Sequence, residues 1–233
     1  MNRPKRTFSS KKVTYSEEDW RRLEKFRGEA EKILKSLEKY NIEGIVHGSV
    51  ARGDVGKKSD IDIMVPHFTS SFKVELALRN ADYRNLKRKI VMATPWQLPK
   101  GHIMLDESKM VTIPLEKPKR LEKEFYEFGG AANIKQLKNE ERVPGVDKRL
   151  ILIEPLKDGH KESQVIGREN EVAKILGVSI EIVAERIEVL TKRDKVGKTG
   201  IFLQRELEDN ENFESIWKKI TETNPQVSKR SRG

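Results

Sequence analysis

The sequence predicts an α+β fold, in which short strands and helices are followed by a small helical domain. Ser16 precedes three acidic residues, as a helix N-cap does, and apolar residues then recur at helical spacing to about Tyr40. Short apolar runs over residues 42–47 and 61–65 predict two strands around a loop rich in glycine and lysine. Beyond residue 161 the pattern changes to that of helices.

The remaining elements follow from periodicity and turn residues. A Thr94–Pro95 step ends one strand, a Gly129–Gly130 pair ends one helix, and Asp106–Lys109 reads as the turn of a hairpin. Residues 157–161 are interpreted as a linker. The expected elements are a helix over 72–89, a strand over 90–93, paired strands over 102–105 and 110–115, helices over 120–128 and 133–140, and a last strand over 150–153.

Composition narrows the class of protein. The chain has no cysteine, so disulfides and cysteine metal sites are excluded. It has no apolar run of about eighteen residues, which excludes a membrane-spanning helix. Its N-terminus lacks the apolar segment of a signal peptide, so a cytoplasmic location is expected. Charged residues make up 36% of the chain, a composition that fits a thermophile.

The net charge of +10 is concentrated in the two tails. Such tails bind the phosphate backbone of RNA or DNA without reading sequence, or they are solvated arms that keep a protein soluble. Both interpretations stay open. The unopposed basic residues are Arg3, Lys5, Arg6, Lys11 and Lys12 at the N-terminus, and Lys229, Arg230 and Arg232 at the C-terminus.

Two aspartates are the leading candidates for a metal site. Asp60 and Asp62 stand at i and i+2 around the start of an apolar strand, so their side chains point to the same face. Neighbouring carboxylates repel each other unless a cation lies between them. Mg²⁺ or Mn²⁺ suits this position, because Mg²⁺ prefers one or two carboxylates together with phosphate oxygens.

The turn before these aspartates has the groups that a triphosphate needs. Gly48 lets the backbone approach phosphate, and Ser49 offers a hydroxyl and an N–H. Arg52 is predicted to stabilise charge on the leaving pyrophosphate, and Lys57 and Lys58 to raise the local positive potential. A P-loop is excluded, since Asp54–Val55 follows Gly53 where lysine and serine or threonine are required.

The stretch GSVARGDVGKKSDIDIMV, which starts at Gly48, resembles the signature of the DNA polymerase β-like nucleotidyltransferases. It is especially similar to the minimal nucleotidyltransferases, which share GSxARG…SDxDL. The resemblance implies a twisted mixed β-sheet with flanking helices, and Asp60 and Asp62 as catalytic metal ligands. The alternative is an ordinary turn followed by surface aspartates, against which the apolar neighbours Ile61 and Ile63 argue.

A third carboxylate usually completes such sites, on a later strand. Asp106 is the catalytic candidate, and its alternative interpretation is a plain hairpin-turn aspartate. His47 and His102 are candidates to face the site, although a lone histidine is more often simply packed. Trp96 is interpreted as a core residue, with base stacking as the alternative.

The C-terminal third predicts a helix-turn-helix. A helix is followed by the turn Gly177–Val178–Ser179 and by a second helix that Ser179 caps. Residues 195–202 read as a β-hairpin, so the unit resembles a winged helix-turn-helix. Its second helix carries Glu181, Glu185 and Glu188, which repel phosphate, so either only the wing binds nucleic acid or the domain binds protein. The predicted nucleic-acid contacts are Lys192, Arg193, Lys195 and Lys198.

Together the two halves resemble an uncharacterised group of archaeal predicted nucleotidyltransferases. The predicted parts are a basic arm over 1–15, a nucleotidyltransferase domain over 16–156, a winged helix-turn-helix over 157–207, and a helix with a basic tail over 208–233. The expected activity is metal-dependent transfer of NMP from an NTP to an acceptor hydroxyl on RNA or protein. The alternative is a non-catalytic, nucleotide-sensing regulator that binds nucleic acid. The segment Arg142–Arg149 has no predicted role.

Overall fold

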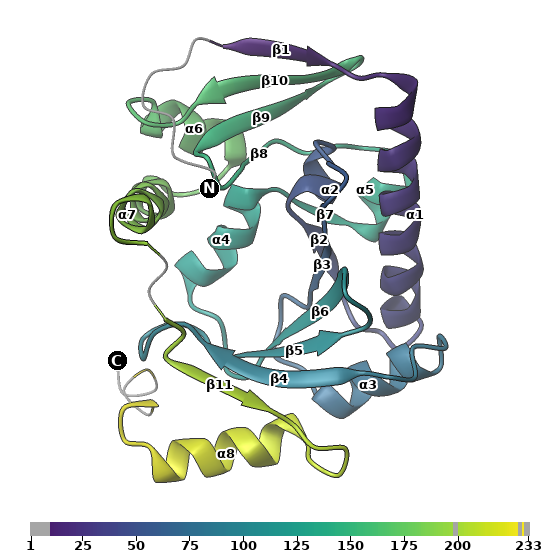
Figure 1. The fold of residues 1–233 in the computed structure, drawn as a ribbon, viewed down its shortest axis with the longest axis vertical. Helices are drawn as coiled ribbons and strands as arrows, with labels where there is room; N and C mark the ends of the chain where they lie inside the picture. The colour runs from purple at the N-terminus through teal and green to yellow at the C-terminus, as the bar shows by residue number, and fades with distance from the viewer. Residues whose placement is uncertain (1–9, 198–199, 228–229, 231–233) are drawn as a thin grey trace. The chain divides into compact units, whose positions relative to one another are not determined.

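The computed structural model describes residues 10–197, 200–227 and 230 (Figure 1). They fall into two compact units that interleave along the chain, and each unit is described by itself. Unit 1 comprises Met1–Glu31, Val46–Ile61 and Lys123–Thr199. Unit 2 comprises Lys32–Ile45, Asp62–Glu122 and Gly200–Gly233.

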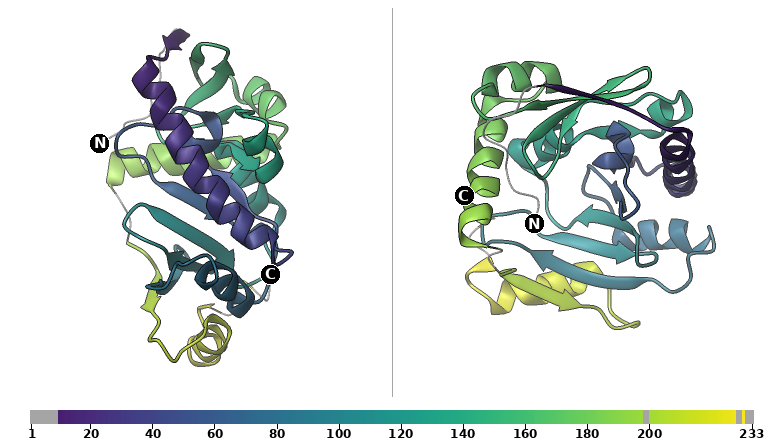
Figure 2. Two further views of the ribbon diagram at one scale, coloured as in Figure 1. Left: turned by 90° about the vertical axis from the view of Figure 1, so that its right-hand side faces the viewer. Right: turned by 45° about the horizontal axis from the view of Figure 1, so that its top comes forward.

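Unit 1 contains a four-stranded antiparallel sheet in the order β1-β10-β9-β8 (Figure 2). Two predictions about this region are wrong. The expected linker over 157–161 is the turn of a hairpin and the first half of its second strand, in which Gly159 pairs with Leu156. Part of the expected N-terminal arm is a strand, because Val13 pairs with His160. The strands are β1 (Lys11–Thr14), β8 (Gly145–Val146), β9 (Ile151–Leu156) and β10 (Gly159–Gln164).

The other elements of unit 1 surround a short pair of strands, β2 and β7. Ser16 caps α1 as predicted, since its hydroxyl oxygen accepts from the amide of Asp19 at 3.3 Å and its own N–H donates to the Asp19 carboxylate at 3.0 Å. The elements are α1 (Glu17–Glu38, which continues into unit 2), β2 (Ile45–His47), α2 (Ser49–Arg52), α4 (Arg120–Gly129), β7 (Ala131–Asn133), α5 (Ile134–Lys138), α6 (Glu169–Leu176) and α7 (Ile180–Val196).

Unit 2 is built on strands in the order β11-β4-β5-β6-β3. The predicted hairpin is confirmed, because β5 and β6 pair antiparallel with His102 opposite Thr112. Helix α8 packs on one face of this sheet, where a Cβ at Gly101 would lie 2.7 Å from the ring of Phe213. The elements are β3 (Ile61–Met64), α3 (Ser71–Arg79), β4 (Lys87–Met92), β5 (Lys100–Met104), β6 (Lys109–Pro114), β11 (Leu203–Glu206) and α8 (Phe213–Thr223).

The helix predicted over residues 72–89 ends ten residues early. Asn80 follows the last turn of α3, and Lys87 begins strand β4. The reason lies in the partners of Arg88, whose guanidinium pairs with Glu75 and donates to the backbone oxygens of Glu208 and Glu211. These contacts need Arg88 and the buried Ile90 on one face of a strand, and tertiary packing therefore overrides the local pattern.

Two helices joined by a turn lie where the sequence predicts them, but the predicted wing hairpin is not found in the described part of the chain, and a winged helix-turn-helix domain stays a prediction. Gly177 has a left-handed conformation (φ 66°), and the hydroxyl of Ser179 accepts from the amide of Ile182. However, α7 extends to Val196 where the first wing strand was expected, and β11 pairs with β4. Residues 198–199 lie outside the described residues.

The described part of the C-terminal tail is folded onto unit 2. Arg230 is 4% exposed, and its guanidinium pairs with Glu122 and lies 3.7 Å from Glu116. Arg230 is therefore not part of a free, solvated tail. The other basic residues of the C-terminal tail, Lys229 and Arg232, and the basic residues before position 10 lie outside the described residues. No helix in the described ranges is both long and apolar enough to span a membrane.

Candidate functional site

The Gly–Ser turn joins β2 to the single helical turn α2. Gly48 has φ 80°, a conformation that side chains other than glycine rarely adopt, and its amide donates to the carbonyl of Gly130 at 2.8 Å. No atom outside the neighbouring residues lies within 4 Å of the place that a Cβ at Gly48 would take. The backbone at Gly48 is thus open to close approach, as predicted for a phosphate-binding turn.

The hydroxyl of Ser49 is held by the end of the same loop. It donates to the hydroxyl oxygen of Ser59 at 3.2 Å, and the amide of Gly56 donates to the same oxygen at 2.9 Å. Because Asp60 follows Ser59, this contact brings the turn and the first aspartate together within unit 1. No role is predicted for Ser59 from the sequence, although it lies within the motif that starts at Gly48 and contacts Ser49.

Strand β3 places the second aspartate. Ile61 and Ile63 are 3% and 1% exposed, whereas Asp62 between them is half-buried and Asp60 is exposed. This alternation puts the Asp62 side chain on the face of β3 opposite to the packed isoleucines, and Asp60 lies in the loop immediately before β3. Two carboxylates that leave room for phosphate oxygens form a donor set that fits Mg²⁺. Among the described residues there is no cluster of three or more potential metal ligands.

Arg52 is not turned outward to a pyrophosphate. Its guanidinium pairs through two nitrogens with both oxygens of Asp54 at 2.9 and 3.0 Å, and its third nitrogen donates to the carbonyl of Gly129 at 2.6 Å. The residue is only 6% exposed. A bidentate buried pair of this kind fixes geometry. Arg52 therefore braces the loop from within, and its predicted contact with nucleotide stays a prediction.

Two glycines leave the space that Arg52 and the turn occupy. A Cβ at Gly130 would lie 2.6 Å from the Arg52 side chain. A Cβ at Gly145 would lie 2.5 Å from the amide nitrogen of Gly130 and 2.7 Å from the carbonyl carbon of Gly129. Since Gly130 accepts the hydrogen bond from Gly48, the close contact at Gly145 acts on the position of the turn.

The segment without a predicted role contributes a second brace. The amide of Val143 donates to the carbonyl of Ala51 in α2, and the Arg142 side chain lies against Gly53. The guanidinium of Arg142 donates to the backbone oxygens of Leu156 and Gly159 and lies 4.8 Å from the Trp20 ring. Residues 142–145 thus support α2 and the loop that follows it.

Tyr15 holds the same loop from the N-terminal side. Its hydroxyl donates to the carbonyl of Gly53 at 2.9 Å and lies 2.7 Å from Nδ1 of His160. Burial and the nearby charge of Asp54 raise the pKa of Tyr15 to about 12. Burial lowers the pKa of His160. Both groups are therefore uncharged near neutral pH and act as fixed hydrogen-bonding partners.

Asp106 is tied to its own turn. Its carboxylate accepts from the amide and hydroxyl of Ser108 at 2.8 and 3.0 Å, and it lies 3.1 Å from the Lys109 ammonium. Desolvation acts to raise the pKa of Asp106, but these hydrogen bonds and the lysine charge outweigh it and lower the pKa. The residue is exposed at the hairpin tip, which is the geometry of the turn interpretation.

The aromatic candidates have different environments. His47 packs against the rings of Phe125 and Tyr126, with ring centres 5.6 and 5.2 Å apart. Trp96 is 62% exposed, so the interpretation of a packed core residue is wrong. His102 lies 2.9 Å from the Thr112 hydroxyl, and burial together with the charges of Lys100 and Lys89 lowers its pKa to about 4.

The basic candidates are scattered along the loop and helix α7. Lys58 is exposed in the loop, and Lys192, Arg193 and Lys195 are exposed in α7, whereas Lys198 lies outside the described residues. The N-terminal half of α7 faces α4: Ser179 donates to Glu124, and the Arg186 guanidinium lies 5.0 Å from the Phe125 ring. Helix α7, the second helix of the predicted helix-turn-helix, therefore uses part of its surface for packing inside unit 1.

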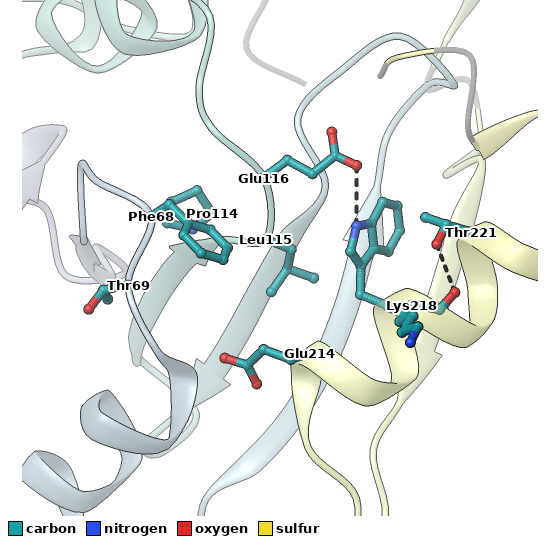
Figure 3. A pocket seen from close by; sticks show the side chains of 9 residues that line it. Phe68, Thr69, Pro114, Leu115, Glu116, Glu214, Lys218 and Thr221 are labelled. Carbon is teal, nitrogen blue, oxygen red and sulfur yellow. Dashed lines mark hydrogen bonds between the residues drawn. The ribbon is translucent and has the colours of Figure 1, made fainter. Parts of the chain in front are cut away.

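The lining of a pocket in unit 2 contains none of the predicted site residues. It includes Phe68, Leu115 and Trp217, and Figure 3 shows Phe68 and Leu115 among the side chains that line it. The indole nitrogen of Trp217 donates to Glu116 at 3.2 Å, and Glu214 accepts from the amide and hydroxyl of Ser71. Both carboxylates are thus engaged in holding α8 and α3.

The fold and the paired aspartates define an α+β protein whose loop and strand carry groups suited to a divalent cation and phosphate. The family model of the nucleotidyltransferase domain matches residues 27–193 of the 233. The chain therefore belongs to the nucleotidyltransferase domain family, whose members transfer nucleotidyl groups. No curated protein and no solved structure shows significant similarity to it.

Proposed function

We propose that the protein transfers a nucleoside monophosphate from an NTP to an acceptor hydroxyl, with Mg²⁺ or Mn²⁺ held by Asp60 and Asp62. The observation that carries the proposal is the hydrogen bond between Ser49 and Ser59, which ties the Gly–Ser turn to the residue next to Asp60. The turn offers Gly48 and Ser49 to the phosphates, and Lys58 adds positive charge beside them.

The divalent cation and the protein residues would contribute to the transfer in different ways. A divalent cation on the two carboxylates would neutralise charge on the phosphates and orient the α-phosphate for attack by the acceptor. The protein's own part is to hold Ser49 and the open backbone of Gly48 in place. Arg52, Tyr15 and residues 142–145 do this by bracing α2 and the loop behind it.

The test is label transfer from α-labelled NTPs to RNA and protein in the presence of Mg²⁺ or Mn²⁺. Asp60→Asn should lower transfer at least about a hundredfold, because a metal supplies several kcal/mol of transition-state stabilisation. Asp82→Asn is the matched control, since Asp82 is an exposed turn aspartate with φ 66° that asparagine tolerates. Transfer by Asp60→Asn at the wild-type rate would contradict the proposal.

A second candidate function is a nucleotide-sensing regulator that binds nucleic acid and transfers nothing. It is favoured by Asp106, whose carboxylate is engaged in its own turn, so a third catalytic acid is not evident there. Binding of an NTP without any label transfer, together with salt-dependent binding of RNA or DNA, would support it.

For either function we propose that nucleic acid meets the exposed basic residues of α7. Lys192, Arg193 and Lys195 lie at its C-terminal end, away from the part that packs on α4. Backbone contacts of this type are independent of sequence and weaken with salt. If the protein is a transferase, a nucleic-acid acceptor would then be an RNA end, which fits the net charge of +10.

A further inference from the structure

The sheet of unit 2 has two unlike faces. Gly101 and Ile113 point toward Phe213 of α8, and Arg88 on the same face pairs with Glu75 of α3. Helices α3 and α8 of unit 2 therefore cover this face. The opposite face, which we call the lysine face, carries the alternate residues of β4, β5 and β6.

Register brings the polar residues of the lysine face into adjacent rows. Lys89, His102 and Thr112 stand directly opposite one another across the three strands. In the next row Lys100 stands opposite Val91. Directly opposite residues have their Cβ atoms about 4.5–5.5 Å apart, so these side chains share one small area.

The electrostatics of His102 supports this placement independently. Burial lowers the pKa of His102, and the charges of Lys100 and Lys89 lower it further, to about 4. The two ammonium groups therefore lie near the imidazole, which is neutral at pH 7 and is oriented by the Thr112 hydroxyl. Lys89 has no ion-pair or hydrogen-bond partner within the described ranges.

The lysine face is next to the strand of the second aspartate. Strand β3 follows β6 in the strand order of the unit, and the amide of Val65, just after β3, donates to the carbonyl of Thr112 at 2.9 Å. Concentrated positive charge beside a carboxylate site for a divalent cation matches a substrate that carries several phosphates.

We propose that Lys89, Lys100 and His102 form a phosphate-binding surface on the lysine face, beside the strand that carries Asp62. Lysine ammoniums contact phosphate oxygens as point charges, and a neutral imidazole with Nδ1 held by Thr112 can donate from its other nitrogen. The phosphate belongs either to the triphosphate of the NTP or to the backbone of a nucleic-acid acceptor. The inference rests on the proposed function for this choice of ligand.

The experiment compares Lys89→Gln with Lys87→Gln. Lys87 lies on the same strand and face two residues earlier and is exposed, so it reports the effect of charge alone. Binding is measured for ATP with Ca²⁺ and, separately, for a poly(U) RNA without nucleotide. Thermal melting checks that both variants fold like the wild type.

Lys89→Gln should lower the binding affinity for one of the two ligands at least about fivefold, whereas Lys87→Gln should change that affinity less than twofold. Weaker ATP binding assigns the surface to the triphosphate. Weaker poly(U) binding, with the slope of log K against log salt reduced by about 0.7, assigns it to the acceptor backbone. Lys89→Arg should restore either one, because it keeps the charge.

Equal effects of the two variants, or no effect of Lys89→Gln on either ligand, would overturn the proposal. The outcome is separate from that of the transferase proposal, because neither binding measurement requires turnover. A wild type that binds through Lys89 but transfers no label would refute the transferase and leave the surface in place. Active transfer with Lys89→Gln unchanged in both assays would do the reverse.

Discussion

The loop from Gly48 to Asp60 and the hairpin turn from Asp106 to Lys109 both present an aspartate, but they are held in opposite ways. The loop is fixed by partners far away in the chain, such as Gly129 for Arg52 and Tyr15 for Gly53. The hairpin turn is fixed by its own residues, because Asp106 bonds only to Ser108 and Lys109 in the described contacts.

This difference shows how a structural aspartate can be told from a functional candidate. A turn that satisfies its own carboxylate gains local stability and leaves that carboxylate little capacity for a ligand. A loop whose polar groups are anchored from outside keeps its exposed groups available. Asp60 is exposed next to Ser59, whose hydroxyl is held by the loop, whereas the carboxylate of Asp106 is already bonded to Ser108 and Lys109.

The largest expected effect tests the difference between the proposed metal-binding aspartates and the hairpin aspartate directly. Asp62→Asn should lower NMP transfer at least about a hundredfold, because it removes one of the two proposed metal ligands. Asp106→Asn should change transfer less than twofold and cost only stability, since asparagine can keep the bond to the Ser108 amide. Initial rates with α-labelled NTP measure both. A hundredfold loss in Asp106→Asn would make Asp106 the third catalytic carboxylate after all.

The next effect tests the anchoring of the loop. Gly145→Ala should destabilise the fold by about 1–3 kcal/mol and weaken NTP binding, because its Cβ would push against the backbone of Gly129 and Gly130. Gly56→Ala is the control inside the loop, since nothing lies within 4 Å of its Cβ position. Denaturant unfolding and nucleotide titration give the two quantities.

The control should stay within about 0.5 kcal/mol of the wild type. If Gly145→Ala lost stability but bound NTP with unchanged affinity, the contact at Gly145 would be structural only. If both variants weakened NTP binding equally, the loop would be sensitive to any added side chain, and anchoring by Gly129 and Gly130 would lose its support.

Local signals in the sequence predicted much of the fold. The cap at Ser16, the hairpin around Asp106 and the turn at Gly177 each depend on residues within a few positions, and each is confirmed. The paired aspartates were found in the same way, because alternation along one strand is a local property. Their role as metal ligands stays a prediction.

Features that depend on distant partners were missed. The residues at 157–161 predict a linker because His160 and Lys161 look solvated until β1 pairs beside them. Nothing near Arg52 in the sequence indicates its hydrogen bond to Gly129, which lies 77 residues further along the chain. No local pattern of charge or periodicity can indicate contacts at that separation.

The smallest expected effect measures how firmly Tyr15 is held to the loop. Its folded pKa of about 12 exceeds the ordinary value of 10.0, because burial and Asp54 disfavour the phenolate. The protonated phenol's contribution to stability is therefore complete below pH 10 and is lost as the pH rises toward 12. Ultraviolet titration of the wild type should show a late-ionising tyrosine that is absent from Tyr15→Phe. A wild-type titration without this late step would mean that the bond from Tyr15 to Gly53 opens readily, and that the loop is anchored by Arg52 and residues 142–145 alone.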